Sequence, residues 1–515
     1  MVNRVNTGAV IGLNSYKVWV ETDVINSLPA VSVVGLPDAA VNEAKDRVKS
    51  AIKNSGYTFP GQKVVINLAP ADLKKNGTSF DLPMAVGVLI EEEVLTQEQV
   101  DDYAFAGELA LDGLIRPVTG ILPLVLGLKE QGIKNIIVPK ENAKEAALID
   151  GINVYGAAHL TDVVSHFTDN PLCVTKINAK EYLAQQSENL EYIYDFKDVK
   201  GQQKAKKALE IAAAGGHNIL MIGSPGSGKT MMAKCFPSIL PPLELDEALE
   251  LTKIYSVSGL LPPDEPLITK RPFRGVHHTA SANGIIGGGT NPKPGEITLA
   301  HRGVLFLDEM VEFPRNVLEV LRQPLEDGEI VISRAMHSVK YPAKFILLGA
   351  MNPCPCGFLG DKEKHCTCSD FQITRYLSKL SGPLLDRIDL QINVPRLTPS
   401  ELLNTEPPKE GSKEIRQRVV KARQIQLERY KNDNIFTNSE LTPKLIKKYC
   451  ELDEVSKQMM KAAIVKYQLS GRRYDRILKL ARTIADLDSS EKITQMHLTQ
   501  ALQFRMFNLA DYGKG

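Results

Sequence analysis

The feature that most constrains the fold is a glycine-rich stretch near the middle of the chain, NILMIGSPGSGKTMMAK. A largely apolar run at 218–222 enters the loop GSPGSGKT, and a helical pattern follows it. This order fits the phosphate-binding motif G-x-x-x-x-G-K-[ST], which joins a buried strand to the start of a helix. We therefore expect an α/β sheet around this loop. The loop residues are Gly223, Ser224, Pro225, Gly226, Ser227, Gly228, Lys229 and Thr230.

The residue types of this loop indicate what it would bind. Glycines allow the backbone to direct its N–H groups at phosphates. Lys229 would reach the β and γ phosphates of ATP, and Thr230 would offer a hydroxyl to Mg²⁺. A glycine-rich turn without a ligand is the alternative, but the full match in its strand, loop and helix context disfavours it.

An acidic strand end supplies the partner that such a loop requires. The segment GVLFLDE at 303–309 predicts a buried parallel strand that ends in two carboxylates. Asp308 would hold Mg²⁺ through water, and Glu309 would polarise the attacking water. Together with the loop, this strand favours a nucleotide hydrolase over a protein that only binds nucleotide.

Two further polar residues follow apolar segments downstream. FILLGAMN at 345–352 predicts another buried strand and ends in Asn352, which would orient water or sense the γ phosphate. An Asn before Pro is also a common turn residue. Arg387 lies in LSGPLLDRIDL, where a surface ion pair is the ordinary expectation for an isolated arginine.

The order of these motifs resembles an AAA+ ATPase. The joined segment RPFRGVHHTASANGIIGGGTNPKPGEITLAHRGVLFLDE, with MNPCPCG, resembles the magnesium-chelatase-like subgroup known as the ComM or YifB family. The resemblance covers essentially the whole chain. It implies an ATP-driven motor related to the chelatase motor subunit and to the minichromosome maintenance helicases. ComM proteins are associated with hexameric DNA helicase and branch-migration activity during natural transformation.

The resemblance also implies roles for individual residues. Arg387 resembles the arginine finger that one subunit supplies to its neighbour, which requires a head-to-tail interface and implies a homo-hexameric ring. The segment SGRRYDRILKLARTIADL resembles a sensor-2 helix, whose apolar face points to Arg472, with Arg476 as the competitor. The cis side of the ATP site would consist of Lys229, Thr230, Asp308, Glu309 and Asn352.

The residue pattern divides the chain into three domains and two linkers. Short β-branched runs alternate with helical segments in 1–167 and 195–396, whereas 413–515 show helical periodicity throughout. The stretches at 168–194 and 397–412 are typical of linkers. With the resemblance, these domains become an S5-like α+β domain, a P-loop AAA+ α/β core and an all-α lid of the magnesium chelatase C-terminal type.

The N-terminal domain resembles the proteolytic domain of Lon in KKNGTSFDLPMAVGVL and FAGELALDGLIRPVTGILPLVLGLKEQGIKNIIVPKEN. Lon-type hydrolysis needs a serine nucleophile and a lysine base. Ser79 lies near the nucleophile position, but Leu122 stands where Lon has its lysine, and neither Lys129 nor Lys140 matches the motif. We expect a non-proteolytic domain used for assembly or nucleic-acid contact.

Composition excludes a chain-wide electrostatic attraction to nucleic acid. The 62 Lys and Arg against 61 Asp and Glu leave a formal net charge of +1, so any DNA contact would need local patches. The chain starts without a charged leader and apolar segment, and no stretch reaches the ~18 apolar residues of a membrane span. We therefore expect a cytoplasmic protein without membrane contact.

Two segments of the core are candidates for DNA contact. EDGEIVISRAMHSVKYPAKFILLGAMN predicts a hairpin, on which Arg334, His337 and Lys340 would contact phosphates without sequence preference. Solvated turn charges are the alternative for this hairpin. ASANGIIGGGTNPKPGEI resembles a helix insertion that forms a second pore loop, with Lys293 as its only cation.

Four of the seven cysteines lie within fifteen residues in the pattern C-x-C-x9-C-x-C. In a reducing compartment such a cluster indicates metal binding rather than disulfides. Four thiolates match a tetrahedral structural Zn²⁺ site, although the single-residue spacers are tighter than usual. His277 and His278 lack such companions, and we interpret them as structural or hydrogen-bonding residues. The cluster consists of Cys354, Cys356, Cys366 and Cys368.

We considered three functions for this sequence. The leading interpretation is an ATP-hydrolysing ring that moves along or remodels single-stranded or branched DNA. A motor that remodels a protein partner, as the chelatase motor subunit does, is the alternative. An ATP-dependent protease conflicts with Leu122 at the position of the catalytic lysine.

Overall fold

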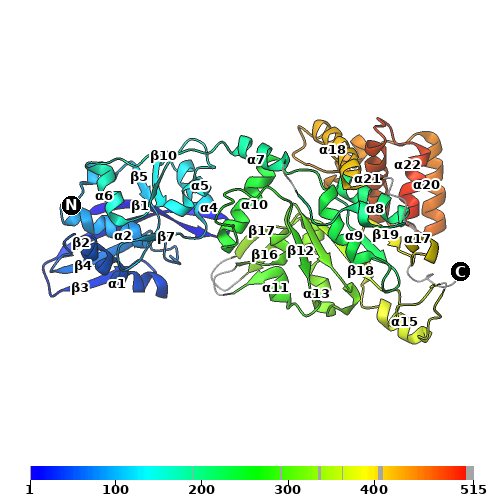
Figure 1. Ribbon diagram of the computed structural model, residues 1–515, viewed down its shortest axis with the longest axis horizontal. Coiled ribbons are helices and arrows are strands. Elements are labelled where there is room, and N and C mark those ends of the chain that lie inside the picture. The colour runs from blue at the N-terminus through cyan, green and yellow to red at the C-terminus, as the bar shows by residue number, and fades with distance from the viewer. Residues whose placement is uncertain are drawn as a thin grey trace. The chain divides into compact units, whose positions relative to one another are not determined.

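The computed structural model describes residues 2–188, 191–289, 293–333, 338–361, 363–403 and 410–505. The chain folds into two compact units (Figure 1). The first unit comprises 1–188 together with 244–269, and the second comprises 189–243 together with 270–515. The chain therefore enters the second unit, returns to the first for one segment and leaves it again. No helix in the described ranges is long and apolar enough to cross a membrane.

The first unit is built on an eight-stranded mixed sheet with the strand order β10-β9-β8-β5-β1-β2-β4-β3. The strands at 14–25 and 63–69 alternate between buried and more exposed residues, as strands with one face packed on a core do. The strands are β1 (Asn3–Ile11), β2 (Asn14–Ile25), β3 (Ala30–Val34), β4 (Lys63–Ala69), β5 (Tyr103–Phe105), β8 (Asn135–Pro139), β9 (Asn153–Ala157) and β10 (Val174–Thr175). A small separate pair consists of β6 (Glu108–Leu109) and β7 (Ile115–Arg116).

Helices supply the core of the first unit. α2 (Asp81–Glu91) and α4 (Ile121–Glu130) are apolar and buried along most of their length, and both pack on β1 and β2. α10 (Leu245–Ser258), from the segment that returns to this unit, packs against α4. The remaining helices are α1 (Ala39–Asn54), α3 (Gln97–Val100), α5 (Ala143–Ala146), α6 (Leu160–Phe167) and α7 (Ala179–Glu188).

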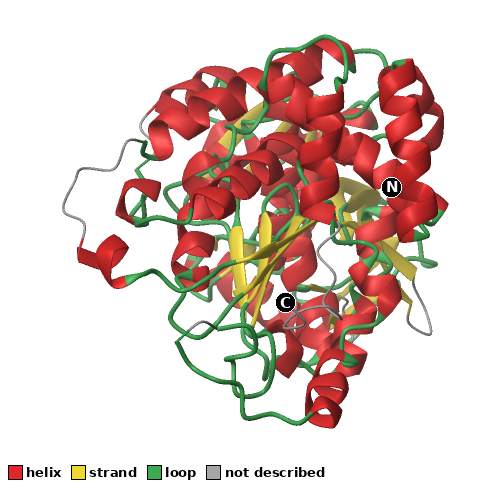
Figure 2. Cartoon of the chain, turned by 90° about the vertical axis from the view of Figure 1, so that its right-hand side faces the viewer, coloured by secondary structure: helices red, strands yellow, loops and turns green. Residues whose placement is uncertain are grey.

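The second unit contains a five-stranded sheet in which every pairing is parallel. Its three inner strands lie between neighbours on both sides and consist of buried residues only, as a parallel sheet covered on both faces requires. Helices surround this sheet (Figure 2). In spatial order the strands are β12 (Phe273–Val276), β15 (Val304–Leu307), β18 (Ile346–Met351), β11 (Ile219–Ile222) and β19 (Leu390–Asn393).

Short helices and two hairpins complete the core of the second unit. The hairpins pair β13 (Gly287–Gly288) with β14 (Lys293–Pro294), and β16 (Glu329–Ser333) with β17 (Ser338–Pro342). The helices are α8 (Gln203–Gly215), α9 (Lys229–Cys235), α11 (Ala282–Ile286), α12 (Glu296–Leu299), α13 (Arg315–Val320), α14 (Pro324–Asp327), α15 (Asp370–Leu377), α16 (Gly382–Leu385) and α17 (Pro399–Leu403).

In the described residues from 410 to 505, five α-helices form the C-terminal part of the second unit. They are α18 (Ser412–Arg429), α19 (Pro443–Tyr449), α20 (Glu454–Tyr467), α21 (Gly471–Leu487) and α22 (Gln495–Arg505). The mixed N-terminal sheet, the parallel α/β core and this helical region confirm the fold class predicted from the sequence.

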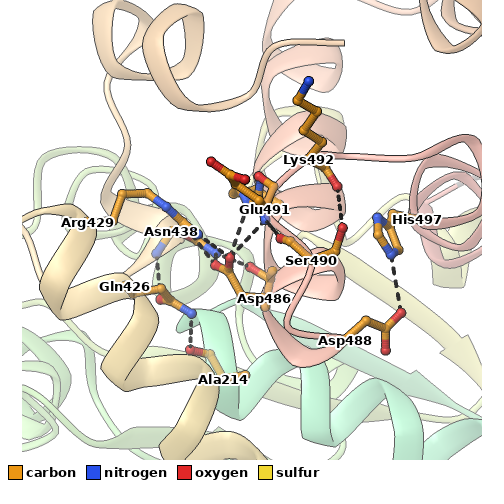
Figure 3. Close-up of polar contacts among 12 residues, drawn as sticks. Ala214, Gln426, Arg429, Asn438, Asp486, Asp488, Ser490, Glu491, Lys492 and His497 are labelled. Carbon is orange, nitrogen blue, oxygen red and sulfur yellow. Dashed lines mark hydrogen bonds and ion pairs between the residues drawn. The ribbon is translucent and has the colours of Figure 1, made fainter. Parts of the chain in front are cut away.

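A buried carboxylate organises these C-terminal helices. Asp486 is 1% exposed and accepts hydrogen bonds from Arg429 Nη1 at 2.9 Å and from Asn438 Nδ2 at 2.8 Å (Figure 3). Arg482 Nε donates to the same carboxylate at 3.1 Å. Nearby, Gln426 Nε2 donates to the carbonyl of Ala214 at 3.1 Å. This hydrogen bond links the C-terminal helices to α8 of the α/β core.

Candidate functional site

The glycine-rich loop joins the carboxyl end of β11 to the amino end of α9. Gly226 and Gly228 have φ angles of 78° and 92°, which side chains other than glycine rarely adopt. A Cβ built on either glycine would meet no atom within 4 Å. The outer side of the loop is therefore open, and it offers backbone N–H groups at the start of a helix, where an anion binds well.

Lys229 lies inside this loop. The side chain is 8% exposed, and its Nζ donates to the carbonyls of Gly223 at 2.8 Å and Ser224 at 3.0 Å. Burial lowers the pKa of Lys229 to about 8, although the negative charges of Asp308 and Glu309 oppose this shift. The ammonium group is thus held at the loop without a directly bonded carboxylate among the described residues.

Parallel pairing brings the acidic strand end to the same place. β15 pairs with β18, and β18 pairs with β11, so the carboxyl ends of all three strands lie at one edge of the sheet. Thr230 Oγ1 donates to Asp308 Oδ2 at 2.7 Å. A hydroxyl and a carboxylate oxygen in contact are the hard donors that Mg²⁺ prefers, so these two residues fit the ion that the motif implies.

Glu309 adopts an unusual backbone conformation. Its φ is 50°, in the left-handed region, and its side chain is 59% exposed. Such strain is costly for a residue with a side chain and concentrates at functional sites. Here it turns the carboxylate outward at the end of β15.

Asn352 follows β18 at the same edge of the sheet. Its Oδ1 lies 3.4 Å from Lys229 Nζ. The structure therefore brings together Lys229, Thr230, Asp308, Glu309 and Asn352, the five residues that the sequence assigned to one site.

Sequence reasoning did not place His278 beside this site. Its Nδ1 lies 3.7 Å from Glu309 Oε2, and its ring packs on that of His277 with centroids 4.1 Å apart. β12 pairs in parallel with β15, so the residues that follow these two strands are neighbours. The order of the strands is the information that the sequence alone did not provide.

Arg387 lies near the amino ends of the strands in the same sheet, opposite the end at which the loop lies. Its carbonyl accepts from Asn218 Nδ2 at 3.0 Å, and Asn218 directly precedes β11. Gly223 comes five residues after Asn218, and five residues of a strand span roughly 16 Å. The arginine is 7% exposed, and its Nη1 donates to the carbonyl of Pro383 at 2.7 Å.

One carboxylate connects Arg387 with Arg472. Glu326 forms an ion pair with Arg387, and its Oε1 lies 3.2 Å from Arg472 Nη2. The Arg472 side chain is 68% exposed, whereas burial and the neighbouring arginines lower the pKa of Arg387. Arg387 Nε has no hydrogen-bond partner within the described ranges. Glu326 thus pairs with two arginines, of which Arg387 is buried and Arg472 is exposed.

Arg476, the competitor of Arg472, has a different environment. Its Nη1 donates to Asp389 Oδ1 at 2.6 Å and to the carbonyl of Arg387 at 3.0 Å. Asp389 is 3% exposed; burial raises its pKa, but the charge of Arg476 and a contact with His217 outweigh burial and lower it overall. Arg476 therefore neutralises a buried carboxylate, which leaves Arg472 as the solvent-facing residue of the pair.

The two hairpins of the core lie against each other. A Cβ built on Gly287 would come within 3.1 Å of Ile332 Cδ1. Lys293 is exposed, and Lys340 Nζ forms an ion pair with Glu329 at 2.9 Å. Arg334 and His337, the other two candidates for DNA contact, lie outside the described residues.

The position of the missing lysine in the first unit is apolar. Leu122 is fully buried, and its backbone N–H donates to Glu145 Oε1 at 3.0 Å. Burial raises the pKa of Glu145, while the hydroxyl of Ser256 on α10 and the N–H of Leu122 oppose this shift. Ser79 lies in a turn before α2 and is partly exposed. No lysine is hydrogen bonded to Ser79 in the part of the chain that the structure describes.

The four clustered cysteines follow Asn352. Their Sγ atoms all lie within 4.8 Å of one another. This is the grouping predicted from the sequence, and its contacts are described below.

Comparison with known proteins gives family matches along the chain. The family described as magnesium chelatase, subunit ChlI matches residues 195–402. A second, subunit ChlI of Mg-chelatase, matches 20–142, and a third, magnesium chelatase, subunit ChlI C-terminal, matches 409–505.

Individual relatives cover nearly the whole chain. The competence protein ComM of Haemophilus influenzae is 43% identical over 504 residues, which are 96% of this chain and 96% of that protein. The uncharacterized protein YifB of Escherichia coli is 42% identical over 501 residues, 97% of this chain and 96% of its own length. The magnesium-chelatase 38 kDa subunit of Rhodobacter capsulatus is 26% identical over 180 residues, 31% of this chain and 51% of that protein.

Proposed function

Because the chain belongs to the ComM/YifB family of magnesium-chelatase-like AAA+ proteins, we propose that it hydrolyses ATP and uses the energy to move along or remodel DNA. The observation that carries the ATPase part is the meeting of loop, acidic strand end and Asn352 at one sheet edge. We further propose that the working form is a homo-hexameric ring.

Each residue at that end of the sheet would have a separate role in hydrolysis. The loop would bind the β and γ phosphates through its backbone N–H groups and Lys229. Thr230 and Asp308 would hold Mg²⁺, which supplies neutralising charge between the phosphates when it is bound. Glu309, turned outward by its backbone conformation, would accept a proton from the attacking water, and Asn352 would hold that water or the γ phosphate.

The position of Arg387 favours action on a neighbouring subunit. It lies about 16 Å along the sheet from the loop of its own chain, and its side chain is directed toward Glu326 and Pro383. An arginine that serves ATP across a head-to-tail interface leads to a closed ring. Arg472 shares Glu326 with Arg387, so we propose that both arginines act in trans.

Mixed subunits test this arrangement. Arg387→Ala should lower kcat by about 10³-fold or more while ATP binding persists. Lys229→Ala lacks the loop lysine but keeps Arg387. Mixing the two inactive variants should restore hydrolysis, because a Lys229→Ala subunit can supply its arginine to an intact loop. Mixtures that stay as inactive as either variant would argue that Arg387 acts within its own chain.

DNA is the proposed substrate of the motor. The Haemophilus relative is a competence protein, which favours DNA as the substrate in this proposal. The two adjacent hairpins, with Lys293 exposed on one of them, are the segments that we expect to contact phosphates. A net charge of +1 limits this contact to local patches, so binding should weaken steeply with salt.

An ATPase and strand-displacement assay on forked and three-stranded DNA tests this proposal, with Lys229→Ala as the control. We expect DNA to stimulate hydrolysis and the Lys229→Ala protein to lose both hydrolysis and unwinding. Undiminished basal hydrolysis that no DNA stimulates would count against a DNA motor. Unwinding by Lys229→Ala would overturn the assigned site.

A motor that remodels a partner protein is the second candidate. The matches to three families of the chelatase subunit ChlI favour it. Under this alternative, a stably bound protein rather than DNA would raise the rate of ATP hydrolysis, and the same assay would separate the two.

A further inference from the structure

The thiols of the cysteine cluster converge on one point. Cys354 Sγ lies 3.4 Å from Cys356 Sγ and 3.6 Å from Cys366 Sγ, and the latter two sulfurs are also 3.6 Å apart. The sulfur of Cys368 completes a group whose members all lie within 4.8 Å. All seven cysteines of the chain are free thiols. The four sulfurs are thus clustered without being linked by disulfides.

These separations fit a single tetrahedral ion. With metal–sulfur bonds of about 2.3 Å, the sulfurs at two corners of a tetrahedron are roughly 3.8 Å apart. An iron–sulfur cluster places more than one iron between its thiolates and would hold the sulfurs farther apart. Four thiolates also leave no open coordination position, so the ion would be structural rather than catalytic.

The chain between the two thiol pairs lies on the phosphate-binding loop. Gly357 has a φ of 85°, and a Cβ built on it would come within 2.6 Å of Pro225 Cδ. Arg396 donates to the carbonyl of Pro225 at 3.3 Å, and its guanidinium lies 5.5 Å from the ring centroid of Phe358. Pro225 therefore contacts both Gly357, which directly follows Cys356, and Arg396.

Two more contacts extend this support. Asp361 lies 3.5 Å from Arg396 Nε and against the Ser224 hydroxyl, which is the largest influence that lowers the pKa of this carboxyl group. Beyond the last thiol, burial raises the pKa of the Tyr376 hydroxyl on α15, and the nearby backbone N–H of Asn352 opposes this shift. One segment within the cluster thus contacts the loop, and another that follows the cluster contacts Asn352.

We propose that Cys354, Cys356, Cys366 and Cys368 bind one structural Zn²⁺ ion, and that this ion braces the phosphate-binding loop and Asn352. The two short C-x-C segments lie twelve residues apart between their first members, and the ion joins them into one rigid unit. Gly357 and Asp361 belong to that unit and hold Pro225 and Ser224 in place. The bracing rests on the proposed ATP site, whereas metal binding does not.

Metal content tests the first part. Full-length protein purified without chelator should carry one zinc per chain by elemental analysis. Cys173→Ser, which removes an exposed cysteine outside the cluster, should keep the zinc, and Cys366→Ser should lose it. A mercurial reagent that reacts with thiols should release zinc from the wild-type protein. Metal-free wild-type protein, iron in place of zinc, or unchanged zinc in Cys366→Ser would overturn the site.

Binding of a fluorescent, non-hydrolysable ATP analogue tests the second part. Zinc-free protein, made by Cys366→Ser or by mercurial treatment of the wild type, should bind the analogue at least about tenfold more weakly, because its loop is no longer held in position. Gly357→Ala should keep its zinc and also bind more weakly, since the new methyl group would displace Pro225. If Cys366→Ser fails to fold, the mercurial-treated wild-type protein still tests whether the zinc ion supports nucleotide binding.

The two proposals fail in different ways. Zinc-free protein that binds the analogue as tightly as wild type would overturn the bracing. Lys229→Ala should lose the analogue and retain zinc. Zinc-loaded wild-type protein that never binds the analogue would overturn the ATP site, and the bracing with it, while the metal site would stand.

Discussion

The affinity for ATP should fall as the pH rises above about 8. Phosphates favour the charged form of Lys229, whose pKa burial lowers from 10.5 to about 8 in the free protein. Above that pH the free lysine is mostly neutral and must take up a proton when nucleotide binds. The apparent Kd then grows by the factor 1 + 10^(pH − pKa), which is about 1.1 at pH 7 and about 11 at pH 9.

The expected change between pH 7 and pH 9 is therefore about tenfold, or about 1.4 kcal/mol. Calorimetric titration with a non-hydrolysable ATP analogue and Mg²⁺, in buffers of different ionisation enthalpy, measures both Kd and proton uptake. About half a proton should enter the complex at pH 8. Lys229→Arg is the matched control, because arginine stays charged throughout this range.

The effect on the stability of the free protein has the opposite sign. Between pH 8 and 10.5 the unfolded chain binds more protons at Lys229 than the folded chain does, so this residue makes stability rise with pH in that window. A general alkaline loss of structure would lower affinity and stability together. Equal wild-type affinities at pH 7 and pH 9, or the same decrease in Lys229→Arg, would refute the reasoning.

Three further perturbations follow from the structure. Asp486→Asn should destabilise the second unit by about 3–5 kcal/mol, because it leaves the charges of Arg429 and Arg482 buried without their carboxylate; thermal unfolding measures this. Asp488→Asn is its matched control, since that carboxylate is 43% exposed and, within the described ranges, forms an ion pair with His497, and its cost should stay below about 1 kcal/mol. His278→Ala should lower kcat for ATP by roughly ten- to a hundredfold through misplacement of Glu309, with nucleotide affinity unchanged; an equal loss of affinity would contradict a positioning role. Glu326→Gln should raise hydrolysis at low protein concentration by freeing Arg387 and Arg472 for a neighbour, and a rate that does not change with this variant would argue against a holding role for the carboxylate.

Local patterns were sufficient to predict the parts of the site that lie on single strands. The run VLFL before Asp308 and the run ILLGAM before Asn352 are buried strands in the structure, because unbroken apolar runs of this length are typical of strands in a parallel sheet covered on both faces. The loop before α9 was also predictable, because its glycines and its lysine are close together in the sequence.

Pairings between distant segments were not predictable from these patterns. His278 meets Glu309 only because β12 lies beside β15, and Glu326 meets Arg387 although 61 residues separate them. Helical periodicity indicates that 245–258 has a face to bury, but not that α4 of the first unit buries it. Each of these facts depends on strand order or on tertiary packing, which a single sequence does not specify.

The returning segment at 244–269 changes how this protein can be taken apart. The polypeptide passes between the two units at three places, near residues 188, 243 and 269. A truncation that starts after residue 188 would leave α10 without α4, and a fragment that ends there would expose the face of α4 that α10 covers. A clean separation of the units would instead require the segment to be excised from one fragment and joined to the other. For the same reason, a protease that cuts once near residue 188 should leave two pieces that still migrate together until they are denatured.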